Sequence, residues 1–209
     1  MVIRPVSPAT LRWLKSLLFV ICLLPVANLA YGVLTSSISG DPVETMTEVT
    51  GQWGLRFLLL TLSITPLRKI LKLADLVKFR RMLGLFAFFY AFCHLNVYIV
   101  FDQFFDWPEI WRDTVEKKFV FAGMLAIILM IPLAITSTNG WIKRLGGKRW
   151  QRLHRLVYII AIAAVVHFIW LVKADLTQPL IYTLILIFLL GFRLFQKFRK
   201  NPAVIKSSV

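Results

Sequence analysis

The three histidines of this sequence, His94, His154 and His167, all lie in or beside apolar stretches. His154 and His167 stand at the two ends of one such stretch, residues 150–170. An ionisable side chain inside an apolar run is costly in lipid unless it has a partner, so each of these histidines is a candidate functional residue. On one helix, His154 and His167 would lie about 20 Å apart. Since a hydrocarbon core is about 30 Å thick, the pattern places one imidazole near each face of a membrane.

The composition supports a membrane environment. Of the 209 residues, 58% are hydrophobic, and the mean hydropathy is +0.74, which is too apolar for a soluble domain of this size. The net charge of +15 could suggest a nucleic acid partner. However, the lysines and arginines fall in short clusters between apolar runs and form no basic domain. We therefore predict an all-α polytopic membrane protein with no nucleic acid partner.

Six apolar runs predict a six-helix transmembrane bundle that forms a single domain over residues 1–209. The predicted spans cover about 11–33, 53–71, 82–100, 119–135, 155–172 and 180–195. The first run follows a basic N-terminus and so also resembles a signal peptide. It continues past Ala30 and further spans follow, which favours a span. The polar segments 35–52 and 102–118 are expected to be loops, and Gly146 and Gly147 are expected to break the helix before the fifth span.

The distribution of charge predicts the orientation of the bundle. Most of the 25 lysines and arginines lie in the N-terminus, in the second and fourth connections and in the C-terminal tail. Of the ten acidic residues, only Asp75 lies in these segments. Short loops rich in lysine and arginine stay in the cytoplasm, so we predict that both termini are cytoplasmic.

In this topology the third and fifth spans run in the same direction, so the depths of their histidines can be compared. Counted from Arg81 and Arg155, His94 and His167 both lie about 18 to 20 Å into the membrane, in its outer half. Two neutral imidazoles facing each other across neighbouring helices could supply both axial ligands of a haem iron. The alternative is two separate buried histidines bonded to backbone or to each other. The matching depth favours a haem bound by His94 and His167.

His154 has three possible roles. Its counterpart on the third span would be Arg80 or Arg81, and arginine cannot ligate iron. His154 would also point about 140° away from the face of His167 on an ideal helix. The sequence therefore does not support a second haem with two histidine ligands. A haem with one histidine ligand, a flavin phosphate held by arginine and a structural role are left open.

Several other types of site are missing from the sequence. Cys22 and Cys93 belong to no CxxC pair, which excludes a zinc ribbon and covalent haem attachment. No glycine-rich dinucleotide fingerprint occurs, so we expect the electron donor to be a membrane quinone or a separate soluble reductase. No metal-thiolate or catalytic triad pattern occurs either. The chain is therefore expected to conduct electrons. A proton-coupled transporter with a histidine relay and a structural membrane anchor are the alternatives, although we find no internal repeat of the kind that transporters show.

Short motifs along nearly the whole chain carry a resemblance to a known family. They are Thr50-Gly51 with Arg56 and Thr65-Pro66-Leu67, then Arg80-Arg81 followed by His94 and Tyr98, then Thr136-Ser137-Thr138 leading to Leu145-Gly146, Trp150, Leu153-His154, Tyr158 and His167. In this order they resemble the bacterial MsrQ (formerly YedZ) family. Its members are haem-binding membrane subunits of a periplasmic methionine-sulfoxide reductase system, within the ferric-reductase-like transmembrane superfamily.

The resemblance implies a location in the bacterial inner membrane, a b-type haem and a bound FMN. It also implies that electrons come from the quinone pool and pass to a soluble periplasmic reductase subunit that contains molybdopterin, in support of the repair of oxidised periplasmic proteins. His94 and His167 would then ligate the haem iron, and His154 would be a third candidate for a haem site. The resemblance assigns no residue to FMN.

Two surfaces could serve such an electron-transfer function. On the outer side, residues 102–116 combine acidic and aromatic side chains that could dock the partner, together with acids in segment 35–52. An interfacial aromatic belt is the alternative. On the inner side, a second redox group would bridge the gap between donor and haem. The charges that could hold its acidic groups are Arg80, Arg81, Arg152 and Arg155.

Overall fold

A computed structural model describes residues 7–200 of the chain, and all regular structure in that range is helical. Six helices are long: α1 (Pro8–Leu34), α2 (Pro42–Ile70), α3 (Val77–Val97), α5 (Lys118–Ile135), α8 (Val157–Leu171) and α9 (Thr177–Lys200). The shorter elements are η1 (Ala74–Leu76), the π-helical turn η2 (Tyr98–Asp102), α4 (Trp107–Glu116), α6 (Asn139–Leu145), α7 (Gly147–Leu153) and η3 (His154–Leu156).

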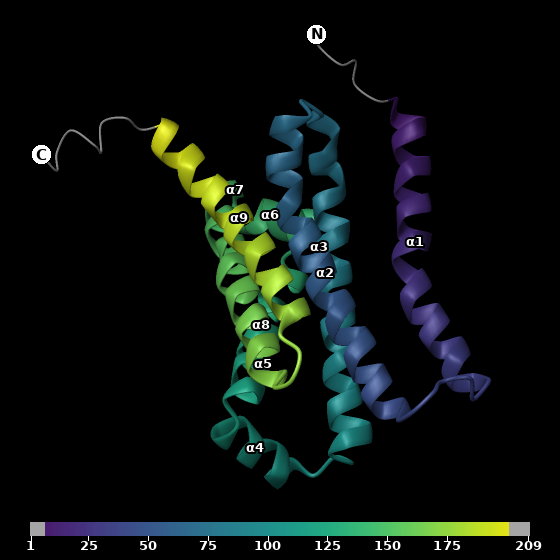
Figure 1. The fold of residues 1–209 in the computed structure, drawn as a ribbon. Coiled ribbons are helices and arrows are strands. Elements are labelled where there is room, and N and C mark those ends of the chain that lie inside the picture. The colour runs from purple at the N-terminus through teal and green to yellow at the C-terminus, as the bar shows by residue number, and fades with distance from the viewer. Residues whose placement is uncertain (1–6, 201–209) are drawn as a thin grey trace, which may run out of the picture.

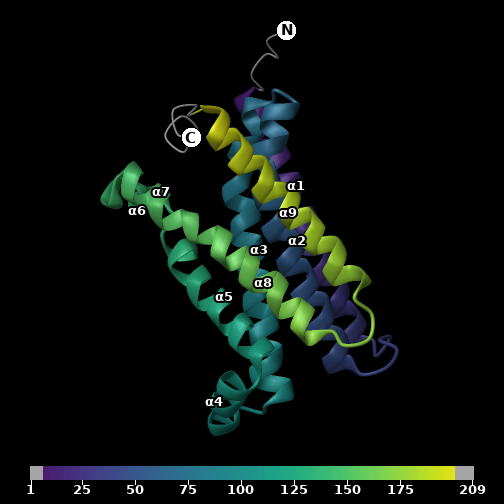
Figure 2. The ribbon, with the colours of Figure 1, turned by 60° about the vertical axis from the view of Figure 1, so that its left-hand side comes forward.

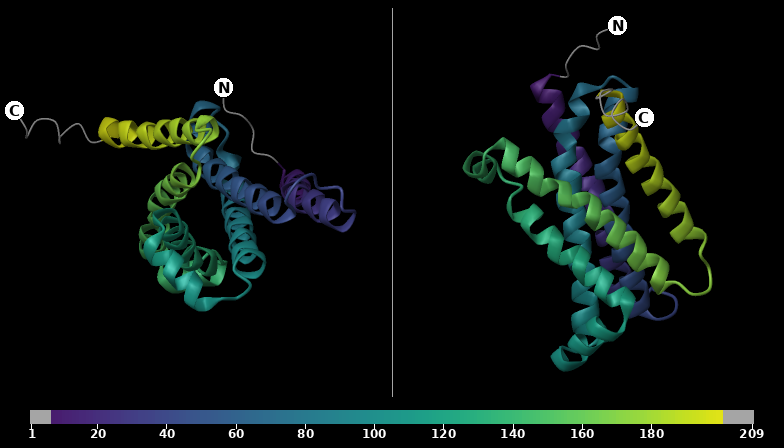
Figure 3. Two further views of the ribbon diagram at one scale, coloured as in Figure 1. Left: turned by 60° about the horizontal axis from the view of Figure 1, so that its bottom comes forward. Right: turned by 90° about the vertical axis from the view of Figure 1, so that its left-hand side faces the viewer.

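The long helices alternate in direction, so that α1 starts and α9 ends at the same end of the molecule (Figure 1). Helix α2 packs along α3, and α5 packs along α8, which gives two antiparallel pairs (Figure 2). Helix α9 contacts both α8 and α2. Viewed from one end, these helices follow one another around a ring, and α1 stands at the outside (Figure 3).

Within the described residues, five helical segments are long and apolar enough to cross a membrane. They are Pro8–Leu34, Ala74–Asp102, Lys118–Ile135, Gly147–Leu171 and Thr177–Arg199. Helix α2 is long enough, but it contains Glu44, Glu48 and Arg56 and is not among the helices that are also apolar enough to cross a membrane. The prediction of a multi-pass helical membrane protein therefore holds, while a sixth span in α2 stays a prediction.

Two segments that we predicted to be loops are partly helical. Helix α2 starts at Pro42, because the Asp41 carboxylate accepts a hydrogen bond from the Val43 N–H at 2.8 Å and proline suits the first helical position. Helix α4 starts at Trp107, where the Asp106 carboxylate accepts from the Glu109 N–H at 3.0 Å. The loop predictions for these parts were wrong, since an aspartate cap starts a helix in each polar segment.

The predicted helix break before the fifth span is confirmed at Gly146. This residue has a φ of +74° and separates α6 from α7. A φ in this range suits glycine, which has no Cβ to clash with the backbone. Both flanking segments are themselves helical, so the connection consists of two short helices at the basic end of the bundle.

Helix α1 is joined to the bundle by the hydroxyl of Tyr90, which is inserted into the helix just after Pro25. The Val26 N–H donates to Tyr90 Oη at 3.1 Å, and Tyr90 Oη donates to the Cys22 carbonyl at 2.8 Å. In a regular helix the Val26 N–H would bond to that carbonyl directly. Proline and an inserted side chain are two known causes of helix kinks, and α1 bends about halfway along (Figure 1).

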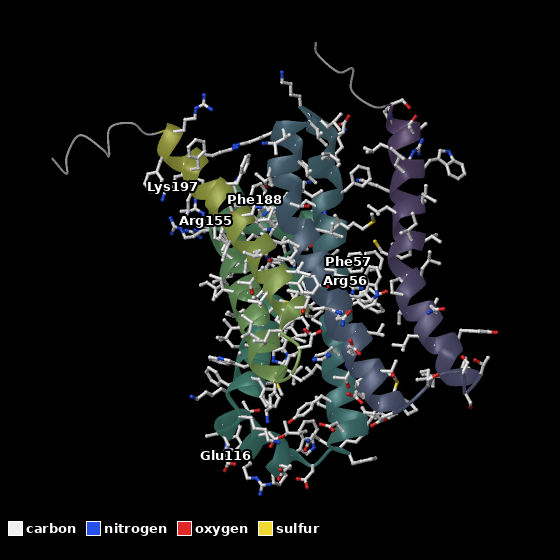
Figure 4. The ribbon with its side chains drawn as sticks, viewed as in Figure 1. Arg56, Phe57, Glu116, Arg155, Phe188 and Lys197 are labelled. Carbon is white, nitrogen blue, oxygen red and sulfur yellow. The ribbon has the colours of Figure 1, made fainter. Side chains whose placement is uncertain are left out.

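Acidic and basic groups gather at opposite ends of the bundle. Glu116, at the end of α4, lies at one end, whereas Arg155 and Lys197 lie towards the other (Figure 4). Between the ends, large apolar side chains such as Phe188 on α9 are exposed, as expected for helices that face lipid.

Candidate functional site

His94 on α3 and His167 on α8 lie next to each other. Their ring centroids are 6.0 Å apart and their planes are inclined at 82°. Both side chains are half-buried. The structure therefore brings together the two histidines that were matched by their depth in the sequence.

A backbone carbonyl orients each ring. His94 Nδ1 lies 2.9 Å from the Thr47 carbonyl of α2, and His167 Nδ1 lies 2.6 Å from the Phe119 carbonyl of α5. Because a carbonyl oxygen can only accept, Nδ1 of each histidine must carry the proton and donate it. Each Nε2 is then left with a free lone pair. Histidines that bind metals are typically held in this way by their other nitrogen.

Two glycines make room for this arrangement. Gly51 and Gly123 each lie one helical turn beyond the residue whose carbonyl binds the histidine. A Cβ at Gly51 would lie 3.0 Å from His94 Nδ1, and a Cβ at Gly123 would lie 2.9 Å from His167 Nδ1. These distances are too short for ordinary contacts. Each imidazole therefore reaches its carbonyl only because the residue beneath the ring is glycine.

The two histidines thus have equivalent surroundings in the two helix pairs. In each pair the first helix supplies a carbonyl and, four residues later, a glycine, while the second helix supplies the histidine. The sequence shows no corresponding repeat apart from these few positions. The equivalence appears only when the helices are paired.

The distance between the rings fits one metal ion bonded by both. Two nitrogen–metal bonds of about 2 Å, with about 1 Å from each ring centre to its nitrogen, give about 6 Å between ring centres. Among the described residues, no group of three or more histidine, cysteine, aspartate or glutamate side chains could hold a metal. A porphyrin would supply the ligands that the protein lacks. The two histidines come from different helix pairs, because α3 packs on α2, and α8 on α5, more extensively than α3 packs on α8. The donor set therefore fits a haem with two axial histidines.

His154 has a different environment, at the basic end of the same helical segment. Its Nε2 lies 3.1 Å from Thr136 Oγ1, and Trp150 stacks on its ring at 4.0 Å between centroids. The Thr136 hydroxyl already donates to the Pro132 carbonyl, so it can only accept from His154 Nε2–H. In this arrangement His154 Nε2 is engaged in a hydrogen bond and is not free for a metal.

Of the four arginines predicted to hold an inner redox group, only Arg80 is half-buried. Arg81, Arg152 and Arg155 are exposed, and Arg81 Nη1 donates to Asn139 Oδ1 at 2.6 Å. Sequence reasoning missed a further arginine, Arg193 on α9, because it was assigned to the basic tail. A single charge within an otherwise apolar run could have identified it as an interior residue.

Comparisons with known proteins identify the family of similar chains. The family model for the ferric reductase like transmembrane component matches residues 50–165. A relative from Herminiimonas arsenicoxydans is named protein-methionine-sulfoxide reductase heme-binding subunit MsrQ. It is 49% identical over 97% of this chain and 95% of its own length. Relatives with the same name from Azospira oryzae and Rhodospirillum rubrum are 46% and 47% identical, over 93% and 88% of this chain and 84% and 88% of their own lengths. No solved structure matches the chain.

Proposed function

The chain belongs to the MsrQ family of haem-binding subunits, within the ferric-reductase-like transmembrane proteins, and on this premise we propose that it carries electrons across a membrane to the catalytic subunit of a methionine-sulfoxide reductase. The electrons would support the repair of oxidised proteins on the far side. The proposal rests on the names of the relatives together with the paired histidines.

The observation that carries the proposal is the pairing of His94 and His167 with both Nε2 atoms free. We propose that these two nitrogens would hold the iron of a b-type haem. A haem iron held there would take up and release one electron at a time. The Thr47 and Phe119 carbonyls keep both rings in the required tautomer. The helix pairs would hold both rings in place, so little reorganisation would accompany electron transfer.

The proposed topology follows from the charges. The basic end of the bundle would face the cytoplasm of a bacterium and the end with α4 would face the periplasm, with α2 as the sixth span in the inner membrane. Arg56 can be accommodated in such a span because its side chain is hydrogen-bonded inside the bundle. Its Nε donates to Tyr182 Oη at 2.9 Å, and its Nη2 donates to Gln52 Oε1 at 2.6 Å. A charge that is hydrogen-bonded inside a bundle is less costly than one that faces lipid.

The direct donor would be a quinone in the membrane or a soluble flavin reductase at the cytoplasmic face. The resemblance also implies FMN, and we retain FMN as a proposed second cofactor. His154 is retained as a candidate residue near the donor side, where its contacts with Thr136 and Trp150 favour a positioning role over ligation.

We propose that the partner, a soluble periplasmic subunit that contains molybdopterin, docks on α4 and the turn before it. Phe104 and Trp111 are 79% and 72% exposed there. Asp113 does not contribute to this surface, because its buried carboxylate accepts from Tyr98 Oη at 3.2 Å and pairs with Lys117 at 2.7 Å. The remaining acids of the segment supply the charge that would steer a basic partner.

Substitution of the histidines tests the proposed function. His94→Ala and His167→Ala should each abolish the low-spin haem spectrum of the purified protein and reduction of the catalytic subunit. His154→Ala is the matched control, since it removes an imidazole from the same helical segment as His167 but should leave that spectrum intact. An unchanged low-spin spectrum in either ligand variant, inserted at normal level, would show that the pairing is wrong.

A further inference from the structure

A second group of polar contacts lies inside the bundle towards its basic end, around Arg193 of α9. Arg193 Nη1 donates to Tyr158 Oη of α8 at 2.7 Å, and Nη2 donates to the Leu62 carbonyl of α2 at 2.6 Å. Its guanidinium also lies over the Tyr158 ring, 5.1 Å from the centroid. Arg193 Nε is the single buried side-chain nitrogen or oxygen without a hydrogen-bond partner in the described part of the chain.

A second positive charge acts on this guanidinium. The half-buried Arg80 of α3 lies close enough for its charge to interact with those of Arg193 and Arg68, and also with His154. No acid forms an ion pair with Arg80 or Arg193 among the residues that the structure describes. Asp75, the one acid of the basic segments, pairs with Lys78.

Such an arrangement is unfavourable by itself. The like charges of the two arginines repel each other, and a buried charge needs a counter-charge or a full set of hydrogen bonds to offset its lost hydration. A bound anion would meet both needs, because guanidinium groups bind carboxylates and phosphates through parallel N–H···O bonds.

We infer that Arg193 and Arg80 form a binding site for a carboxylate or phosphate group inside the basic half of the bundle. Arg193 Nε–H is the donor still free for this group, and Tyr158 and the Leu62 carbonyl hold the guanidinium in position to present it. The site adds an anionic ligand to the proposed function and does not depend on the identity of the electron donor.

The depth of the site limits which molecules could supply the anionic group. Leu62 lies about 12 Å of helical rise before the end of α2, so Arg193 reaches into the apolar part of the bundle. Tyr158 also lies one helical turn beyond His154, at the inner edge of α8. Two sources share this chemistry. One is the acidic group of a redox cofactor that lies within the bundle, and the other is the phosphate of a phospholipid inserted between the helices.

The test compares Arg193→Gln with Arg199→Gln, which removes an equal charge from the exposed end of the same helix. The full-length proteins are purified in detergent. Haem and flavin per polypeptide are measured after extraction, and retained phospholipid is measured by native mass spectrometry. Loss of a charged hydrogen bond should weaken binding of the anion roughly ten- to a hundredfold. Insertion into the membrane at the wild-type level serves as the control for folding.

Loss of a haem or a flavin in Arg193→Gln alone would support the site and identify the anion as part of a cofactor. Loss of a phospholipid with unchanged haem and flavin would also support the site and identify the lipid. Wild-type contents of all three would overturn the inference. Should Arg193→Gln fail to insert, Arg80→Gln decides by the same measurements, because the site needs both charges.

Discussion

Gly123→Ala is a specific test of how the proposed haem site is built. A Cβ at this position would lie 2.9 Å from His167 Nδ1 and 3.1 Å from its Cε1. Ordinary contacts to carbon start near 3.5 Å, so the ring must retreat by about 0.5 Å. The ring is held at 2.6 Å by the Phe119 carbonyl, and a retreat of this size would stretch that hydrogen bond and tilt Nε2.

The effect on stability should be small and the effect on haem binding large. Overpacking costs about 1 to 3 kcal/mol, and alanine returns about 1 kcal/mol of helix propensity, which leaves a net loss of about 0 to 2 kcal/mol. Loss of a partner that orients a ligand typically weakens metal binding about 10- to 100-fold. We therefore expect Gly123→Ala to fold but to bind haem about 10- to 100-fold more weakly.

The assay is a titration of haem into the haem-free variant, followed by the low-spin absorption bands. Gly191→Ala is the matched control, because an added Cβ on this α9 residue has no neighbour within 4 Å. Its affinity for haem should equal that of the wild type. Wild-type affinity together with an unchanged low-spin spectrum in Gly123→Ala would refute the argument that glycine is needed beneath the histidine ring.

Two further predictions concern parts outside the haem site. Tyr90→Phe should lower the free energy of unfolding by about 1 to 3 kcal/mol, because it removes the hydroxyl between the Val26 N–H and the Cys22 carbonyl. Thermal unfolding would measure this, and an unchanged midpoint would contradict it, whereas the haem spectrum should not change. Replacing both Asp102 and Glu116 by their amides should slow reduction of the catalytic subunit at low salt and have little effect at high salt. Equal rates at every salt concentration would exclude this surface as the docking site.

The sequence predicted the long helices well but failed in the polar segments. Apolar runs of sufficient length predict helices in lipid because the backbone must satisfy its own hydrogen bonds there. In segments 35–52 and 102–118 the acidic composition suggested loops. Asp41 followed by Pro42, and Asp106 followed by Pro108, were nevertheless local signals for a helix start.

The proximity of His94 and His167 was predicted from their depth alone, since rise along a helix is fixed by geometry. The carbonyls and glycines that hold the rings could not be predicted in this way. They depend on the register and rotation of α2 against α3 and of α5 against α8, which no single helix specifies. Arg193 was missed for a different reason, because a residue near the end of a span was assumed to face water.

The equivalent settings of His94 and His167 also have a consequence for the order in which the protein is assembled. Each histidine is oriented by the helix before it in the same antiparallel pair, so neither pair needs the other to prepare its ligand. The α2–α3 pair can form with one half of the site complete, and the α5–α8 pair can follow with the second half. A metal centre bonded by both rings would then link two helix pairs that had formed separately. In the haem-free protein, the weakest interface would therefore be the one between the α2–α3 pair and the α5–α8 pair, while each pair keeps its own structure.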